Sequence, residues 1–167
     1  MLIPMLVSAQ VKKNIDKEKS AVTYSMNHML HAWEGTSTSL NGIVQIKEDG
    51  QIEKVAIVSK VRAFDSKSSS RDAHMLEVTE ALKFPNIIFS SNAVSELSNG
   101  ELDIKGSLQF HGVKKDIAVK GTKKSKGNTT IVNGNFIFLL EDFNIERPSF
   151  MLKKVDNEVK VAFEIHY

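Results

Sequence analysis

The stretch FDSKSSSRDAHMLEVTEALKFPNIIF, residues 64–89, is the one part of the sequence with a clear helical period. Apolar residues recur along one face of the expected helix, at Met75, Val78, Ala81 and Leu82. The spacing Ser69-x-x-Asp72 is that of a capping box, which marks the start of a helix. Because Pro85 disfavours helical backbone at the residue before it, the helix should end just ahead of this proline. The pattern therefore predicts one helix over about residues 71–83.

On both sides of this helix the sequence alternates between apolar and polar residues, as strands with one buried face do. Eight such segments are present, over residues 22–31, 43–46, 52–59, 86–96, 102–110, 113–120, 131–140 and 158–165. Turn sequences separate several of them, at Asp49-Gly50, Asn99-Gly100, His111-Gly112 and Gly127-Asn128. We expect Trp33-Glu34-Gly35 to bend the chain after the first strand.

Long sequential strands with one apolar face fit a closed antiparallel barrel, because closure removes the unpaired edges of a large sheet. The sequence therefore predicts a mainly β fold, an eight-stranded antiparallel barrel with one helix inserted mid-chain. The interior of such a barrel is either filled by side chains or holds one small ligand. Periodicity alone leaves both alternatives open.

Composition limits the classes of function. The 167 residues suffice for one domain, and the net charge of +2, with 25% charged residues, argues against a dedicated nucleic-acid-binding protein. The absence of cysteine excludes disulfides, thiolate catalysis and cysteine-ligated metals. No apolar run approaches the roughly 20 residues with which a helix spans a bilayer.

The N-terminal sequence MLIPMLVSAQ contains an apolar run followed by Val7-Ser8-Ala9, which has the small residues of a signal-peptide cleavage site. We expect residues 1–9 to be the remnant of a secretory signal and residues 10–167 to form a single exported domain. The basic first region and the longer apolar core of a full signal are missing. An ordinary apolar N-terminal segment therefore stays open as the alternative.

Histidine, aspartate and serine side chains raise the alternatives of a metal site and an enzyme. On one strand, His28 and His31 would point to opposite faces, so we predict no metal site and a His28 that is buried or lines the mouth of the barrel. Asp72, His74 and the serines at 68–70 are residue types of hydrolases, yet they crowd one helix start without a nucleophile motif. Helix capping explains them, so we assign no catalytic residue. An enzyme that uses His28, Asp72 or His74 remains a lesser alternative.

Lysines are concentrated around one predicted hairpin, at Lys114, Lys115, Lys120, Lys123, Lys124 and Lys126. A cluster of this kind either makes transient contact with an anionic membrane surface or forms a solvated loop that protects strand edges. Both alternatives stay open.

Aromatic and methionine side chains are spread over most of the expected strands, with 9 Phe and 6 Met in the chain. Most should belong to a packed core, but together they also form adaptable apolar walls for a flexible ligand. The side chains that we expect in the lumen or at its mouth are Tyr24, Met26, His28, Phe64, Met75, Val78, Leu82, Phe84, Phe89, Phe110, Phe136, Phe138, Phe143, Phe150, Met151 and Phe163.

Several motifs follow one another in an order that is typical of a known family. They are Val22-x-Tyr24-x-Met26-x-His28, Trp33-Glu34-Gly35, Ser70-Arg71-Asp72-Ala73-His74-Met75, Lys83-Phe84-Pro85-x-Ile87-x-Phe89, Phe110-His111-Gly112-Val113 and Asp142-Phe143-Asn144-Ile145-x-Arg147-Pro148. In this order they resemble the YceI-like family over about residues 21–167. The sequence departs from the family at Asn144, where glycine is frequent, and the shape of that loop is left open.

The resemblance implies a lipocalin-like, eight-stranded antiparallel barrel with one helix, exported to the bacterial periplasm. It also implies that the lumen binds a polyisoprenoid lipid or an isoprenoid quinone, with no other cofactor required. We therefore expect a non-catalytic carrier of a long apolar lipid, with a homodimer left open. The rival hypothesis is a barrel with a packed interior that binds a protein partner in the periplasm.

Overall fold

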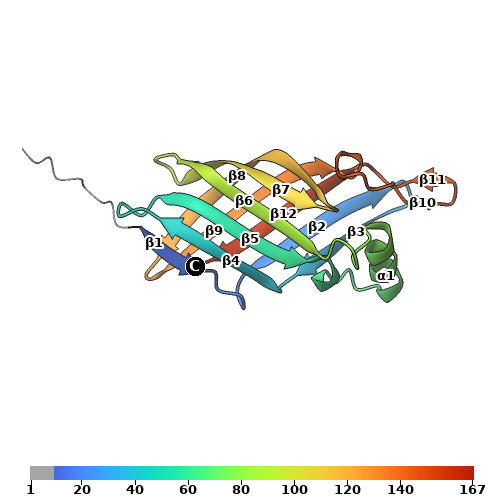
Figure 1. Ribbon diagram of the computed structural model, residues 1–167, viewed down its shortest axis with the longest axis horizontal. Helices are drawn as coiled ribbons and strands as arrows, with labels where there is room; N and C mark the ends of the chain where they lie inside the picture. The colour runs from blue at the N-terminus through green and yellow to red at the C-terminus, as the bar shows by residue number, and fades with distance from the viewer. Residues whose placement is uncertain (1–9) are drawn as a thin grey trace, which may run out of the picture.

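Ten antiparallel strands form one strongly curled sheet in the computed structural model, which describes residues 10–167 apart from the side chain of Phe150 (Figure 1). In their order across the sheet, the strands are β1 (Val11–Asn14), β4 (Leu40–Ile46), β5 (Ile52–Lys60), β6 (Asn86–Glu96), β7 (Glu101–Phe110), β8 (Val113–Lys126), β9 (Thr129–Leu139), β12 (Glu158–His166), β2 (Ala21–His28) and β3 (His31–Ser37). A separate two-stranded ribbon pairs β10 (Ser149–Phe150) with β11 (Lys153–Lys154). The remaining elements are the helix α1 (Ser69–Val78) and the short 3-10 helices η1 (Val61–Ala63) and η2 (Glu141–Phe143).

Backbone contacts beyond the strand ladders tie both edges of the sheet to distant segments. The N–H of Asp16, which follows β1, donates to the carbonyl oxygen of His166 at the end of β12 over 2.7 Å. Thr36 in β3 forms an isolated antiparallel bridge with Asp65. Because β1 and β3 are the outer strands of the sheet, these contacts hold it in its curled, barrel-like form.

The prediction of eight strands is wrong, because the chain folds back earlier than its alternating pattern suggests. The expected first strand, residues 22–31, is split into β2 and β3 by a turn at Met29 and Leu30. Trp33-Glu34-Gly35, for which the sequence predicts a bend, lies inside β3. A further strand, β1, forms in the charged segment before β2. The mainly β, antiparallel architecture with one helix is confirmed.

The four predicted turn sequences each join two neighbouring strands. They connect β4 to β5, β6 to β7, β7 to β8 and β8 to β9. Positive φ angles between 60° and 83° occur at their glycines, Gly50, Gly100, Gly112 and Gly127. Glycine adopts this conformation without steric cost because it has no Cβ. These turns were predictable because the backbone conformation that they need selects a recognisable residue.

The helix α1 is shorter than predicted. Glu80 has a φ of +45°, and its N–H donates to the carbonyl oxygen of Glu77 at 3.0 Å. The N–H of Ala81 donates to the carbonyl oxygen of Leu76 at 2.9 Å. This pair of bonds is a Schellman motif, which ends a helix. Residues 79–83, which the sequence pattern assigns to the helix, form turns instead.

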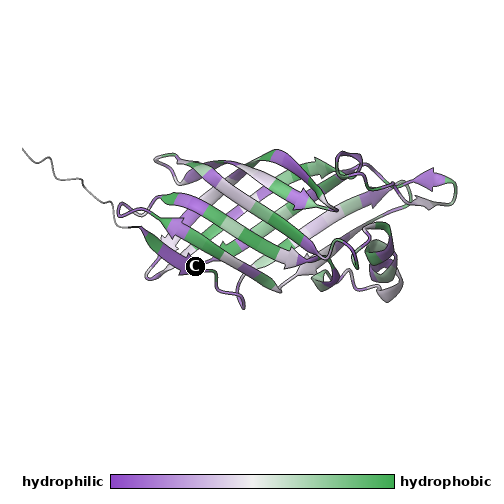
Figure 2. Cartoon of the chain, viewed as in Figure 1, coloured by the Kyte–Doolittle hydropathy of each residue, from purple (hydrophilic) through white to green (hydrophobic). Residues whose placement is uncertain are grey.

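Apolar and polar residues alternate along the strands, so that one face of the curled sheet lines the interior (Figure 2). In β12, Val159, Val161 and Ile165 are buried, whereas Lys160 and Ala162 are exposed. The two-residue period of a strand produces this division.

Among residues 10–167, no helix is both long enough and apolar enough to cross a bilayer.

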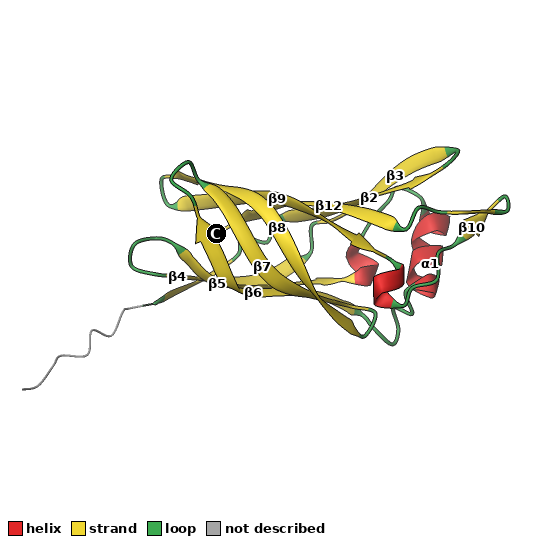
Figure 3. Ribbon diagram, turned by 90° about the horizontal axis from the view of Figure 1, so that it is seen from above, coloured by secondary structure: helices red, strands yellow, loops and turns green. Residues whose placement is uncertain are grey.

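The barrel-like body has two different ends (Figures 1 and 3). One end carries α1, the turn between β2 and β3, and the β10–β11 ribbon, and we call it the mouth. The other carries the start of β1 and the C-terminus, and we call it the closed end. One cluster of buried apolar side chains, which includes Leu102, Val119 and Ile165, lies toward the closed end. A second, which includes Phe110 and Phe143, packs beneath α1.

Candidate functional site

The curled sheet encloses a cavity of about 590 Å³. Pockets that hold small molecules commonly measure about 300–1,000 Å³ and are mostly apolar. Inward-facing strand residues and one side of α1 form the walls, which are largely aliphatic and aromatic. The aliphatic part includes Val44, Val55, Ile104, Val119, Val132 and Val161. Side chains therefore do not fill the interior completely, which contradicts the packed-interior alternative.

Most of the side chains predicted for the lumen or its mouth do line this cavity. They are Tyr24, Met26, His28, Phe64, Met75, Val78, Phe89, Phe110, Phe136, Phe138 and Phe163. They come from β2, α1, β6, β7, β9, β12 and the loop after η1, so the fold brings together residues that are distant in sequence. Their contact with a ligand stays a prediction.

Two of the positions predicted for the lumen or its mouth, Leu82 and Met151, are not part of the cavity wall. Leu82 has an exposed fraction of 103%, because the Schellman motif ends α1 before it reaches the cavity. Met151 is 70% exposed at the tip of the β10–β11 ribbon and does not line the cavity. The side chain of Phe150, which we also predicted for the site, lies outside the described side chains.

Phe84 and Phe143 are also not on the cavity wall. The ring of Phe84 packs edge-on against His111, with ring centroids 4.9 Å apart. Phe143 is only 1% exposed and packs against Phe138 with ring centroids 5.3 Å apart. Phe143 therefore supports a wall ring from behind, a role that the sequence pattern does not distinguish from lining.

Two aromatic rings of the wall lie directly over glycines on the neighbouring strand. A Cβ added at Gly35 would lie 2.4 Å from the ring of Tyr24, its direct cross-strand partner. At Gly134 it would lie 2.5 Å from the ring of its partner Phe163. Because any larger residue would collide with these rings, the glycines allow both rings to lie close to the sheet and leave the lumen open.

Polar side chains of the cavity wall are concentrated at the mouth. The turn after β2 places His28 directly opposite His31, with ring centroids 5.6 Å apart. The prediction that these rings point to opposite faces is therefore wrong, because the two residues lie on different strands. The ring of His31 lies 5.5 Å from that of Trp33, and the guanidinium of Arg71 lies 5.4 Å from the Trp33 ring. These four residues and His74 all line the cavity.

At the closed end the cavity is lined by buried apolar side chains and by Tyr167. The Tyr167 hydroxyl is buried and has no hydrogen-bond partner among the described residues. Burial raises the pKa of this phenol to about 12. Tyr24 also has a raised pKa, first because of burial and then because of the nearby Asp72 carboxylate. Both phenols therefore stay neutral near physiological pH.

Arg71 and Asp72 hold the loop that precedes α1. The Asp72 carboxylate accepts hydrogen bonds from the hydroxyl and the N–H of Ser66, at 2.6 and 3.1 Å. Arg71 donates to the carbonyl oxygen of Ser66 at 3.2 Å. The predicted capping box is wrong, because Ser69 lies inside the helix and the cap residue Ser68 makes no side-chain cap bond.

The residues considered for an enzyme or a metal site have separate neighbours. His74 Nδ1 lies 3.5 Å from Glu77, whereas His28 Nε2 lies 3.3 Å from the carbonyl oxygen of Lys153. The Asp72 carboxylate accepts its hydrogen bonds from Ser66 in the loop before α1, and neither histidine takes part in these bonds. Within residues 10–167, no group of three or more His, Cys, Asp or Glu side chains is placed to bind a metal ion.

The aliphatic part of the wall and most of the polar mouth were not predicted from the sequence. Strand alternation identifies the inward face, so it could have indicated the aliphatic residues. His31, Trp33 and Arg71 were harder to find, because their meeting depends on the turn at Met29-Leu30. That turn contains no glycine, proline, asparagine or aspartate to mark it.

Comparison with known proteins shows to which family this chain belongs. A protein-family model described as a YceI-like domain matches residues 14–167. The chain belongs to the YceI-like family. Protein YceI of Salmonella newport (strain SL254) and of Salmonella arizonae are each 26% identical to it in an alignment of 126 residues, with a coverage of 73% of this chain and 65% of each relative. The chain thus spans less than two thirds of the length of these YceI proteins.

Solved structures of low sequence identity share the fold of this YceI-like chain. Burkholderia cenocepacia BcnA superimposes with a TM-score of 0.83 at 19% identity, covering 92% of this chain and 99% of BcnA. A polyisoprenoid binding domain from Saccharophagus degradans gives 0.74 at 12% identity, covering 96% and 98%. The Campylobacter jejuni YceI protein gives 0.69 at 17% identity, covering 80% and 82%.

Proposed function

We propose that this YceI-like protein is a non-catalytic carrier that binds a long isoprenoid or other long-chain lipid in its cavity. The observation that carries the proposal is the cavity of about 590 Å³ with largely apolar walls. Removing a hydrocarbon chain from water is worth about 0.8 kcal/mol per CH₂ group, so such walls bind it without specific polar contacts. The similar fold of the Saccharophagus polyisoprenoid binding domain supports isoprenoids as the lipid class.

An isoprenoid with a small polar head, such as an isoprenoid quinone, fits the distribution of polarity along the cavity. Histidine, tryptophan and arginine side chains line the mouth, whereas the wall toward the closed end is apolar up to Tyr167. The proposed ligand therefore places its tail toward the closed end and its head at the mouth, and requires no other cofactor. We also propose export to the periplasm; the predicted signal remnant, residues 1–9, lies outside the residues that the structure describes.

The direct test is identification of a bound lipid. The full chain is expressed in a bacterium, purified without detergent, extracted with organic solvent and analysed by mass spectrometry. We expect a prenyl or other long-chain lipid to be recovered with the folded protein and lost after heat denaturation. A protein that carries no lipid and also fails to bind added polyprenol or a quinone with a prenyl tail would contradict the carrier function.

A matched pair of substitutions tests whether the lumen is the binding site. Val55 and Ala56 are neighbours on β5, but Val55 lines the cavity and Ala56 is exposed on the outer face. Val55→Phe should fill part of the lumen and weaken polyprenol binding by roughly tenfold, because less apolar surface of the ligand can be buried. Ala56→Phe should bind as the unchanged protein does. Equal affinity of both variants would place the ligand outside the cavity.

A further inference from the structure

The most exposed large apolar side chains among the described residues gather at the mouth. They are Leu82, Leu152, Met29, Met151 and Leu30, with exposed fractions of 103%, 100%, 71%, 70% and 59%. The next most exposed large apolar residue reaches only 53%. Met29 and Leu30 form the turn between β2 and β3, which we call the first tip, and Met151 and Leu152 form the turn of the β10–β11 ribbon, the second tip. Figure 3 shows both hairpins and α1 at the same end of the body.

The two tips border the opening of the cavity. His28 and His31, which flank the first tip, both line the cavity, as does Ser149 at the start of the ribbon. The imidazole Nε2 of His28 lies 3.3 Å from the carbonyl oxygen of Lys153, which follows the second tip. A ligand that enters at the mouth therefore passes between apolar side chains that already project into the surroundings.

The second tip holds its apolar residues in an unfavourable backbone conformation. Met151 and Leu152 have φ angles of +49° and +65°, a region in which hairpin turns usually carry asparagine and glycine. Large side chains at such positions are uncommon, and strain of this kind persists mainly at functional sites. Ordinary turn chemistry therefore does not explain why two large apolar residues occupy this tip.

Lysines lie beside the apolar groups of the mouth. Lys153 and Lys154 follow the second tip, Lys83 follows Leu82, and all three are exposed. Exposed apolar residues with neighbouring lysines suit the boundary of an anionic bilayer, where the hydrocarbon inserts and the ammonium groups reach the phosphates.

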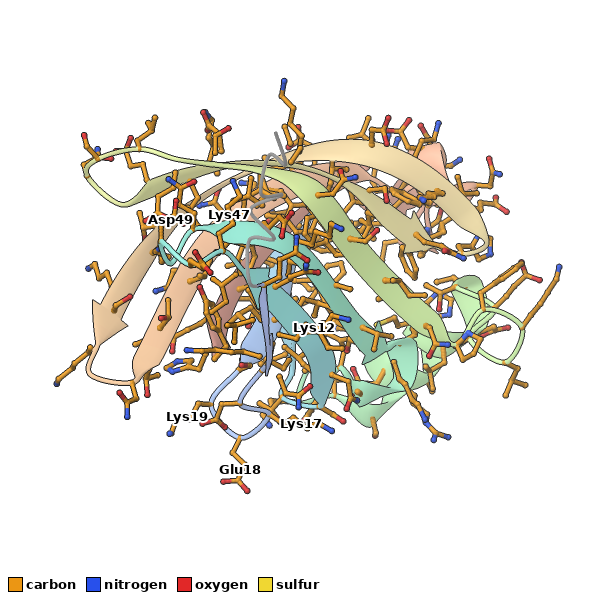
Figure 4. The ribbon with its side chains drawn as sticks, turned by 60° about the vertical axis from the view of Figure 1, so that its left-hand side comes forward. Lys12, Lys17, Glu18, Lys19, Lys47 and Asp49 are labelled. Carbon is orange, nitrogen blue, oxygen red and sulfur yellow. The ribbon has the colours of Figure 1, made fainter. Side chains whose placement is uncertain are left out.

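The closed end exposes charged side chains of both signs. Its exposed side chains include Lys12, Lys17, Lys19 and Lys47 together with Glu18 and Asp49 (Figure 4). Of the lysines that the sequence places around one hairpin, Lys123, Lys124 and Lys126 also lie toward this end, because they precede the β8–β9 turn and Thr130 after it pairs with the C-terminal Tyr167. Lys114 and Lys115 lie at the other end of β8, next to the turn at Gly112. A membrane contact through Lys123, Lys124 and Lys126 would hold the mouth away from the bilayer.

We propose that the mouth docks on a lipid bilayer that contains anionic phospholipid, with both tips and Leu82 inserted at its surface. This inference rests on the proposed lipid-carrier function and names the surface from which the ligand enters. An isoprenoid chain resides in bilayers because its transfer to water is costly. Docking by the mouth allows the chain to move between bilayer and cavity without crossing water.

Vesicle co-sedimentation tests the docking surface. The full chain is mixed with phosphatidylcholine vesicles, with and without phosphatidylglycerol. We expect binding that increases with phosphatidylglycerol and falls with added salt, because the lysine contribution is screened. The double variants M29S/L30S and M151S/L152S should each bind about tenfold more weakly, because they remove inserted hydrocarbon. Leu97→Ser is the matched control, since Leu97 is 49% exposed in a turn at the closed end.

Ligand uptake separates this inference from the carrier function. Both tip variants should take up a long polyprenol from vesicles more slowly, yet bind a short water-dispersed prenol as the unchanged protein does. If the unchanged protein does not bind the short prenol, the carrier function is rejected. Docking is then still tested independently by sedimentation with vesicles. Tip variants that sediment with vesicles as the unchanged protein does would overturn the docking proposal. The docking proposal would also be overturned if the protein does not sediment with vesicles but forms a dimer that the tip substitutions abolish. The tips would then form the contact between two copies of the chain.

Discussion

At the scale of single residues, the Asp72 carboxylate fixes the loop that leads into α1. It accepts two hydrogen bonds from Ser66, which is only 7% exposed. Asp72→Ala should lower the free energy of unfolding by about 1–3 kcal/mol, because it leaves buried donors without this acceptor. Asp72→Asn should cost less, since its amide oxygen can still accept one bond. Urea denaturation measures both. If Asp72→Ala instead abolished a catalytic turnover without changing stability, the enzyme alternative would gain support.

The buried phenol of Tyr167 gives a pH dependence with a defined sign. The unfolded chain loses the phenolic proton near pH 10, whereas the folded protein holds it to about pH 12. Because the unfolded state then binds fewer protons, the free energy of unfolding should fall as pH rises above 10, by about 1 kcal/mol near pH 11. Tyr167→Phe should remove this part of the slope and leave stability at pH 7 nearly unchanged, since its hydroxyl has no partner among the described residues. An unchanged slope in that variant would assign the titration to another group, such as Tyr24.

Asn144 shows how a residue that departs from the family pattern can still fit its position. It caps η2 in the left-handed region, with φ of 56° and ψ of 30°. Asparagine enters this region more readily than other residues that carry a Cβ. The loop therefore keeps the backbone conformation that glycine would allow.

At the scale of elements, α1 is the part of the cavity wall best suited to open. None of its residues is fully buried, although Ser70, Met75 and Val78 line the cavity. Hydrogen exchange should show residues 66–84 less protected than the central strands in the empty protein, and more protected once polyprenol is bound. The protection of β7, in the middle of the sheet, serves as the internal reference. Equal protection of residues 66–84 in both states would make α1 a fixed plug and move the entrance toward residues 143–151.

The elements that the sequence predicted correctly are those whose turns select particular residues. Glycine marks four hairpins because their backbone has positive φ. The end of α1 uses the same kind of left-handed residue, but Glu80 occupies it, and its carboxylate lies 2.8 Å from His111 Nε2. Because this contact joins residues that are far apart in the sequence, the local sequence pattern does not predict it. The turn at Met29-Leu30 was missed for a related reason, since its apolar residues continue the strand pattern.

Across the whole molecule, the fold places polar side chains at the mouth of the cavity and apolar side chains along the rest of its wall. The aromatic and aliphatic side chains of the lumen were predictable as a group, because strand alternation sends them to the same face. Their assignment to mouth, wall or supporting layer was not, because it depends on how far the sheet curls and on which strands flank each turn. His28 and His31 meet only after β2 and β3 pair, and α1 covers that same end. The result is a cavity with a polar entrance and an apolar interior.

This polarity predicts the orientation of the ligand, and the single tryptophan of the chain can report it. Trp33 lines the cavity at the mouth, beside His31 and Arg71. A quinone with a prenyl tail should quench Trp33 fluorescence strongly, because its head would lie beside the indole. A polyprenol of the same chain length, which lacks an absorbing head, should bind with little quenching and serves as the control. Calorimetry confirms that both ligands are bound. Saturating binding of the quinone without quenching would mean that the head lies at the closed end near Tyr167, where the buried phenol hydroxyl would be the donor to its carbonyl.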